Sequence, residues 1–446
     1  MASEYFLYIQ LGKLLADSRN YFWSVKKYES YSGEHLKALT RHHNGHIRQR
    51  AVLCLGLIRD VSALPHIIKR INDWAEPVRK SAKQSVERLL IDINADYFVE
   101  CLPDIFWLLE CQRVDHREFV DSIIKFLSHS KNKKALFTGL SFNDKLVAKH
   151  SLDLLVNNSL FPIGVVFTET MSNCNPIIRM HATKYQLKEM GVGNRYVIEI
   201  MLGDRFAPIK QLALQYMIDQ NIILTEELAF KLLVDKNALV RSRAYRLLPE
   251  KEFNIIEFYL DILNDAASCA VKRKIALCGL SEHKYERVVE LCERSLDSLS
   301  PGIYICSLKI IVQHRGEDAR DILLDAMANS CICIVKSALS LIKKEKIHVK
   351  NSDAQGFLDI LPSPSNLSVY YSLASLLNKW DWLLFIVRNE VAGGAEFTKL
   401  QIAYWGECYN RSSIPPTEFQ REQLKIFINN IEESFIVDKV NFFILE

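Results

Sequence analysis

The chain has 446 residues, and its 49% hydrophobic and 24% charged residues are the proportions of a folded protein, which excludes extensive disorder. Sixteen glycines and twelve prolines are too few for a β-sandwich rich in tight turns. A net charge of only +3 weighs against a dedicated nucleic-acid binder, and no apolar run reaches the roughly 18 residues needed to cross a bilayer.

Residues 1–40 are expected to form a helical N-terminal cap. Their apolar residues, among them Tyr5, Tyr8, Leu11 and Leu15, recur at intervals close to the 3.6-residue period of a helix. The terminal units of a repeat array differ from the inner ones because they must cover an exposed face of the core.

Residues 41–345 carry a pattern with a step of 31 residues. Each copy has an aliphatic anchor, usually a basic residue directly after it, and usually an alanine four positions after it. The anchors are Ile47, Val78, Val147, Ile178, Ile209, Val240 and Val271. One degenerate unit is expected near residues 98–130, with one helix over Phe98–Leu109, and approximate units follow Gly279. Because each unit contains two apolar helical faces, the sequence predicts an all-α array of about ten helix pairs.

An acidic residue precedes several of these second helices, five positions before the anchor. The basic residue after the anchor lies in the first helical turn, where the helix dipole disfavours a cation, so the acidic residue is its natural partner. These features resemble the short form of the HEAT repeat family over about residues 40–345. The resemblance implies a right-handed α-solenoid whose second helices form the concave face and whose turns carry a ladder of pairs. The implied pairs are Asp73 with Arg79, Asp204 with Lys210, and Asp235 with Arg241.

The repeat pattern stops before the C-terminal part of the chain. Residues 346–365 are expected to be a linker, and residues 366–446 an aromatic-rich helical subdomain or cap. Trp380 and Trp382 lie two positions apart and so are not expected to face one core together. With Trp405, they are a candidate second contact surface.

No catalytic residues, metal or cofactor are predicted. No Ser-His-Asp or Cys-His arrangement follows from the spacing, and His42, His43 and His46 have no cysteine or carboxylate beside them. The eleven cysteines form no Cys-x-x-Cys pair and are expected to be reduced thiols. The first residues lack a basic segment followed by an apolar one, so a cytoplasmic location is expected.

The third position after the anchor carries a basic residue in five units. We call these residues the basic stripe: Arg50, His150, His181, Arg243 and Lys274. The stripe predicts either a groove for an acidic protein or a phosphate backbone, or a solvated flank paired with nearby acids.

We therefore expect a non-enzymatic scaffold or adaptor that binds a protein partner through the concave face. The alternative is a nucleic-acid-binding protein, similar to HEAT-like DNA glycosylases or to a DNA-binding defence component, that uses the basic stripe. The identity of the partner and the oligomeric state do not follow from the sequence.

Overall fold

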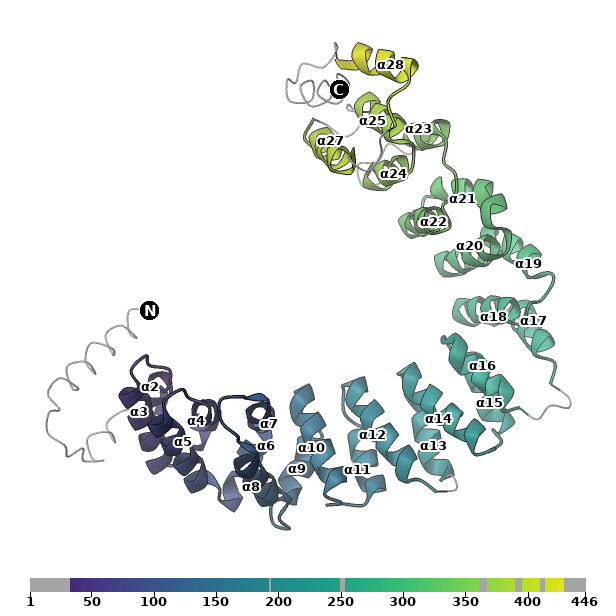
Figure 1. Ribbon diagram of the computed structural model, residues 1–446. Helices are drawn as coiled ribbons and strands as arrows, with labels where there is room; N and C mark the ends of the chain where they lie inside the picture. Colours follow the sequence, from purple (N-terminus) through teal and green to yellow (C-terminus); the bar gives the residue numbers. More distant parts are fainter. Residues whose placement is uncertain are drawn as a thin grey trace. The chain divides into compact units, whose positions relative to one another are not determined.

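The computed structural model describes residues 33–191, 194–248, 253–360, 367–389, 395–409 and 414–428, and these residues contain helices and no β-strand (Figure 1). The predicted all-α fold is confirmed. The chain divides into two compact units, residues 1–222 (unit 1) and residues 223–446 (unit 2), and each is described by itself. Of the predicted N-terminal cap, residues 1–32 lie outside the described residues.

Unit 1 consists mainly of helix pairs in which a first helix packs on the second helix that follows it. The regular pairs are α2 (Gly33–Leu39) with α3 (Gly45–Leu57), α4 (Leu64–Ile71) with α5 (Glu76–Leu89), α9 (Lys133–Gly139) with α10 (Lys145–Asn157), α11 (Ile163–Thr170) with α12 (Pro176–Glu189), and α13 (Arg195–Gly203) with α14 (Ala207–Asp219). The second helices also pack on one another, α3 on α5, and α12 on both α10 and α14.

The expected degenerate unit lies between α5 and α9 and contains α6 (Ala95–Glu100), α7 (Leu102–Trp107) and α8 (Arg117–Ser128). The prediction of a single helix over Phe98–Leu109 is wrong. The first helix, α6, ends before Cys101, and a new helix, α7, begins after it with Pro103 in its first turn. A proline has no N–H and clashes with the carbonyl four residues earlier, so it starts a helix more readily than it continues one.

Unit 2 continues the helix pairs and ends in a cluster of further helices. The pairs are α15 (Glu226–Leu233) with α16 (Ala238–Arg246), α17 (Ile255–Asn264) with α18 (Ala270–Glu282), α19 (Val288–Arg294) with α20 (Pro301–Arg315), and α21 (Arg320–Met327) with α22 (Ile332–Glu345). The further helices are α23 (Asn351–Ile360), α24 (Leu367–Ala374), α25 (Lys379–Arg388), α27 (Ala395–Tyr409) and α28 (Glu418–Ile428). Part of the predicted linker is thus helical, since α23 packs on α24 and α25.

A small buried residue allows the regular second helices to approach their neighbours. The seventh residue after each N-cap is alanine or serine, with at most 2% of its surface exposed. These residues are Ala51, Ala82, Ser151, Ala182, Ala213, Ala244, Ala276, Ser307 and Ala338. Helix axes come within about 8–10 Å only where the side chains at the crossing are small, so the alanine seen in the sequence has a packing role.

The 31-residue step predicted from the sequence is wrong by one residue at α18. Its N-cap Cys269 follows the N-cap Asn237 of α16 by 32 residues instead of 31. The predicted anchor Val271 is 49% exposed, and Ala276, rather than Ile275, occupies the small buried position. The extra residue therefore moves every position of α18 by one relative to the sequence pattern.

Candidate binding surface on the second helices

The arginines of the second helices link neighbouring repeats. Arg48 donates two hydrogen bonds to the carboxylate of Asp73, from Nε at 2.8 Å and from Nη2 at 2.7 Å, and Nη1 donates to the backbone oxygens of His42 and His43, both at 2.8 Å. Arg179 repeats this arrangement, with bonds of 2.7 and 3.0 Å to Asp204 and one of 2.8 Å to the backbone oxygen of Asn173.

Arginine–aspartate pairs therefore do link neighbouring repeats, but they are not the pairs predicted from the sequence. Asp73 pairs with Arg48, 25 residues earlier, and not with Arg79. Arg79 and Arg241 instead donate to the backbone oxygens of Asp73 and Asp235, at 2.9 and 2.6 Å. A guanidinium has donors on two edges, so one edge caps its own turn while the other reaches the next repeat.

Two further ladder residues also differ from the prediction. Burial alone would raise the Asp204 pKa, but the hydrogen bonds from Arg179 and the Phe206 amide, with the charge of Arg179 and a smaller effect of Lys210, hold it below its ordinary value. The carboxylate of Asp235 accepts from the Asn237 amide at 2.8 Å, while Arg241 pairs with Glu282. The Arg48–Asp73 and Arg179–Asp204 pairs are largely buried and join neighbouring repeats, so their role is to stabilise the stack.

The basic stripe divides between the units and is less uniform than the sequence indicates. Arg50, His150 and His181 belong to unit 1, and Arg243 and Lys274 to unit 2. The first four are half-buried at the sixth position after their N-caps, whereas Lys274 is exposed at the fifth, and buried Ile275 takes the sixth. Lys274 is thus out of register with the other four.

His150 and His181 contribute little positive charge at neutral pH. Burial lowers the pKa of both imidazoles below the ordinary value, and the ring of His150 stacks on Phe106 with centroids 4.3 Å apart. The stripe of unit 1 is therefore not a continuous row of cations.

We expect the His150 imidazole to titrate below pH 6.5, and Phe106→Ala to raise its pKa towards that value by exposing the ring to water. Because the folded-state pKa is lowered, the neutral ring stabilises unit 1 fully above the unfolded pKa, and this contribution is lost as pH falls towards the folded pKa. Proton NMR of the imidazole C–H signals measures both values. A pKa at or above 6.5 in the parent protein would contradict the burial of this ring as its controlling feature.

The three tryptophans proposed as a contact surface are buried, so that prediction is wrong. Trp380, Trp382 and Trp405 are 2%, 5% and 1% exposed. Trp380 donates to the backbone oxygen of Ile414 at 2.8 Å, and Trp405 donates to that of Lys379 at 2.7 Å. Helix α25 is enclosed by α23, α24, α27 and α28, so residues two apart on it can both face neighbouring helices.

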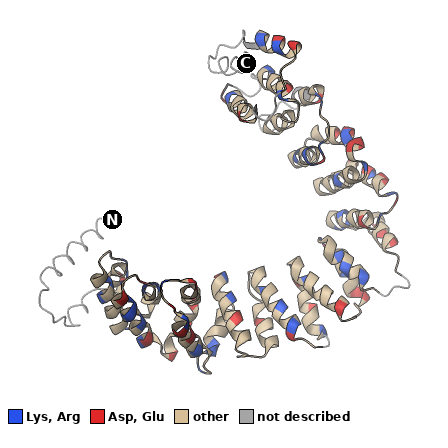
Figure 2. Cartoon of the chain, in the orientation of Figure 1, with Lys and Arg blue, Asp and Glu red and all other residues tan. Residues whose placement is uncertain are grey.

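Charge is separated between the two layers of unit 2. Its second helices α16, α18, α20 and α22 contain eleven Lys and Arg but two Glu, whereas its first helices α15, α17, α19 and α21 contain eight Asp and Glu but three Lys and Arg. In Figure 2 both colours occur on both sets of helices, and the counts show that basic residues predominate on the second helices and acidic residues on the first. The small net charge of the chain conceals this separation.

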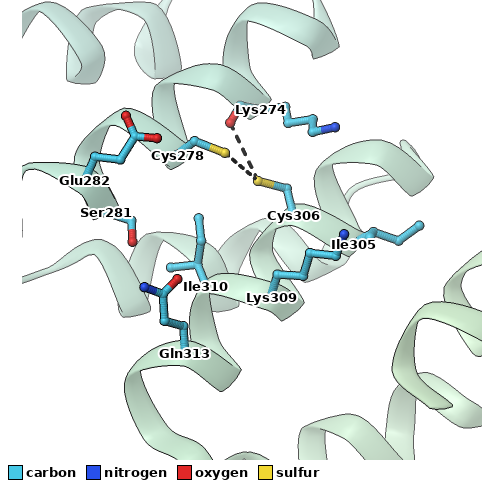
Figure 3. A pocket seen from close by; sticks show the side chains of 9 residues that line it. All are labelled: Lys274, Cys278, Ser281, Glu282, Ile305, Cys306, Lys309, Ile310 and Gln313. Carbon is cyan, nitrogen blue, oxygen red and sulfur yellow. Dashed lines mark hydrogen bonds between the residues drawn. The ribbon is translucent and has the colours of Figure 1, made fainter. Parts of the chain in front are cut away.

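The basic layer contains a depression of about 340 Å³ between α18 and α20 (Figure 3). Lys274 and Lys309 line it together with Ile305, and both lysines are exposed and make no ion pair among the described residues. Its one carboxylate, that of Glu282, is paired with Arg241. A small anionic or acidic group would therefore meet a net positive wall with an apolar floor.

Two of the eleven cysteines, expected from the sequence only to be reduced thiols, meet in this depression. Cys278 on α18 and Cys306 on α20 have their sulfur atoms 3.3 Å apart, and the Cys306 sulfur also lies 3.7 Å from the backbone oxygen of Lys274. Their separation of 28 residues follows no known cysteine motif, so only the packing of α18 on α20 reveals the pair.

The histidines near the start of unit 1 do not form a metal centre. His42 is buried, stacks on His43 with ring centroids 4.2 Å apart, and accepts from the Asn44 amide at 2.9 Å through Nδ1. Over the described ranges as a whole, no three His, Cys, Asp or Glu side chains lie close enough to hold a metal ion. Every described helix is too short or too polar to span a bilayer.

Neither the protein-family models nor the curated proteins include a match to the sequence. Among solved structures, an engineered protein is 14% identical over 63% of this chain and 94% of its own, with a TM-score of 0.17. The complex of CpcE and CpcF of phycocyanin lyase from Nostoc is 13% identical over 71% of this chain and 95% of its own, with a TM-score of 0.18. At these TM-scores neither likeness carries an argument about function.

Proposed function

We propose that this protein is a non-enzymatic, HEAT-like scaffold or adaptor of the cytoplasm, and that the second helices of unit 2 bind an acidic segment of a partner protein. The observation that carries the proposal is the charge separation, eleven basic against two acidic side chains on the four second helices. A field of one sign over a packed helical layer attracts an oppositely charged partner and orients its approach.

Three lysines form the centre of this surface. Lys274 and Lys336 occupy the fifth position after the N-caps of α18 and α22, and Lys309 occupies the ninth position on α20, between them. Positions five and nine lie on one side of a helix, and α20 packs on both neighbours, so the three ammonium groups share one face.

The character of the depression favours a protein over a nucleic acid. Proteins that hold single strands usually stack the bases on aromatic side chains, and the residues lining this depression are aliphatic, thiol, amide, hydroxyl and charged. Ile305 beside Lys274 and Lys309 fits a peptide in which apolar and acidic residues alternate.

The test is binding of a fluorescent Glu-and-Leu peptide and of a single-stranded oligonucleotide of equal charge, measured by fluorescence anisotropy. The triple variant Lys274→Glu, Lys309→Glu, Lys336→Glu should weaken peptide binding about 100-fold, because placing like charges together costs several kcal/mol. The matched control reverses Lys231, Lys284 and Arg294, which are exposed outside the second helices, and should bind like the parent.

Equal binding of the peptide by the parent and the triple variant would show that this surface is not the site. Tight binding of the oligonucleotide with no binding of the peptide would overturn the proposal in favour of the nucleic-acid alternative. In that case the logarithm of affinity should fall linearly with the logarithm of salt concentration.

A further inference from the structure

The depression of unit 2 holds a pair of thiols in a reactive arrangement. Both cysteines line the depression, but Cys278 is half-buried whereas Cys306 is only 5% exposed. Their sulfur atoms, at 3.3 Å, need to move little more than about 1 Å to reach disulfide bonding distance. Both residues are on helices packed side by side, so the approach is held by the fold.

The surroundings favour a thiolate on Cys278. The hydrogen bond from the Cys306 thiol, aided by the charges of Arg241 and Lys274, outweighs burial and lowers the pKa of Cys278 to about 7. The same interaction raises the pKa of Cys306. By contrast, burial raises the pKa of Cys101 and of Cys292 to about 12. The thiolate is the nucleophilic form of cysteine, so Cys278 is the attacking group.

The charges around the pair select the reagent. Lys274 and Lys309 line the opening, and the carboxylate of Glu282 is occupied by Arg241. A small molecule that carries carboxylates is therefore drawn towards Cys278, and an uncharged one is not.

We propose that Cys278 and Cys306 form a reactive dithiol site for small anionic disulfides, and that its product is a disulfide bond between α18 and α20. The Cys278 thiolate attacks one sulfur of the reagent, forms a mixed disulfide, and releases the other half of the reagent as a thiolate. Cys306 then loses its proton and attacks the Cys278 sulfur, which expels the second half as a thiolate. Two protein thiols are oxidised, one reagent disulfide is reduced to two thiols, and the reaction reverses with excess thiol. This site does not depend on the proposed function.

The experiment treats the folded protein with oxidised glutathione, blocks remaining thiols by alkylation, and maps the cysteines by mass spectrometry. The protein carries Cys331→Ser and Cys333→Ser, because those two sulfur atoms are also only 2.9 Å apart. A Cys278–Cys306 cross-link should form before exposed Cys174 reacts, while buried Cys101 stays unmodified. Reaction of Cys278 no faster than Cys174, or no cross-link, would overturn the proposal.

Two variants separate the steps. Cys306→Ser should retain one glutathione on Cys278, because no thiol remains to displace it, whereas Cys278→Ser should leave Cys306 unmodified. The reverse assignment, with Cys306 carrying glutathione, would contradict Cys278 as the attacking group. The cross-link in the protein that keeps both cysteines tests the pair even if a serine variant does not fold.

Charge selection is tested with Lys274→Gln, Lys309→Gln. This variant should react about tenfold more slowly with oxidised glutathione, the lower end of the range for electrostatic steering. Its rate with uncharged bis(2-hydroxyethyl) disulfide should match that of the parent. Equal slowing with both reagents would show that the lysines act on the thiolate and would overturn the preference for anionic reagents.

Discussion

Asp73→Ala is expected to lower the free energy of unfolding of unit 1 by about 3–5 kcal/mol, the usual effect of removing one partner of a buried ion pair. The side chains of Arg48 and Asp73 are 3% and 0% exposed. The substitution leaves the Arg48 guanidinium without its two bonds to the carboxylate, and it removes the acceptors of Arg70 and of the Ala75 amide. Urea unfolding followed by circular dichroism measures the change.

Two comparisons isolate the buried pair. The double variant Arg48→Ala, Asp73→Ala should be less destabilised than the sum of the single variants, because it leaves no buried charge unpaired. Glu199→Ala breaks the exposed pair with Arg195 and should cost under about 1 kcal/mol. An Asp73→Ala effect as small as that of Glu199→Ala would show that this contact does not hold the repeats together.

The effect of Asp73→Ala should also depend on pH. Burial alone would raise the Asp73 pKa, but the Arg48 and Ala75 hydrogen bonds and the charges of Arg48 and Arg70 outweigh it and hold the pKa below its ordinary value. The carboxylate therefore stabilises unit 1 fully above the unfolded pKa of about 3.9, and this contribution is lost as pH falls towards the folded pKa. The difference between parent and variant should shrink below about pH 4.

Trp405→Ala is expected to destabilise unit 2 by about 3–5 kcal/mol, as for other large aromatic residues removed from a core. The ring is 1% exposed, lies 5.6 Å from that of Trp380 between centroids, and donates to the Lys379 backbone oxygen. Trp405→Phe should destabilise unit 2 less than Trp405→Ala because it keeps most of the packing. It should still destabilise the unit somewhat, because the Lys379 backbone oxygen loses its donor.

Leu400, on the same helix α27, provides the control. Its side chain is 66% exposed, so Leu400→Ala should change the free energy of unfolding by under about 0.5 kcal/mol. Thermal unfolding of the three variants compares them directly. If Trp405→Ala unfolds at the same temperature as the parent, the indole is not a core residue. That result would favour the contact surface predicted from the sequence.

The sequence by itself determined the helix pairs. The 31-residue step, with two apolar faces per unit, could be satisfied only by helices that bury those faces against their neighbours. The recurring alanine also identified the close helix contact correctly, since only a small side chain suits that position whatever surrounds it. These features depend on residues within one repeat, so the spacing of residues along the sequence is enough to predict them.

Contacts between repeats were decided by the tertiary structure. The sequence paired Asp73 with Arg79 in its own repeat, but the carboxylate points to Arg48 of the preceding one. The spacing of Trp380 and Trp382 predicted that they would not face one core together, because it assumed a helix with one buried side. In the structure α25 is enclosed by four other helices, and both rings are buried.

The arrangement of the candidate site was also decided by the tertiary structure. The basic stripe treats His150 and His181 as cations, but burial lowers the pKa of both imidazoles and so favours the neutral rings further. One extra residue before α18 moved Lys274 out of the stripe and placed it beside Lys309 and the Cys278–Cys306 pair. A position in the sequence fixes which residue is present, but its protonation and its neighbours depend on burial and helix packing, which form only when the repeats stack.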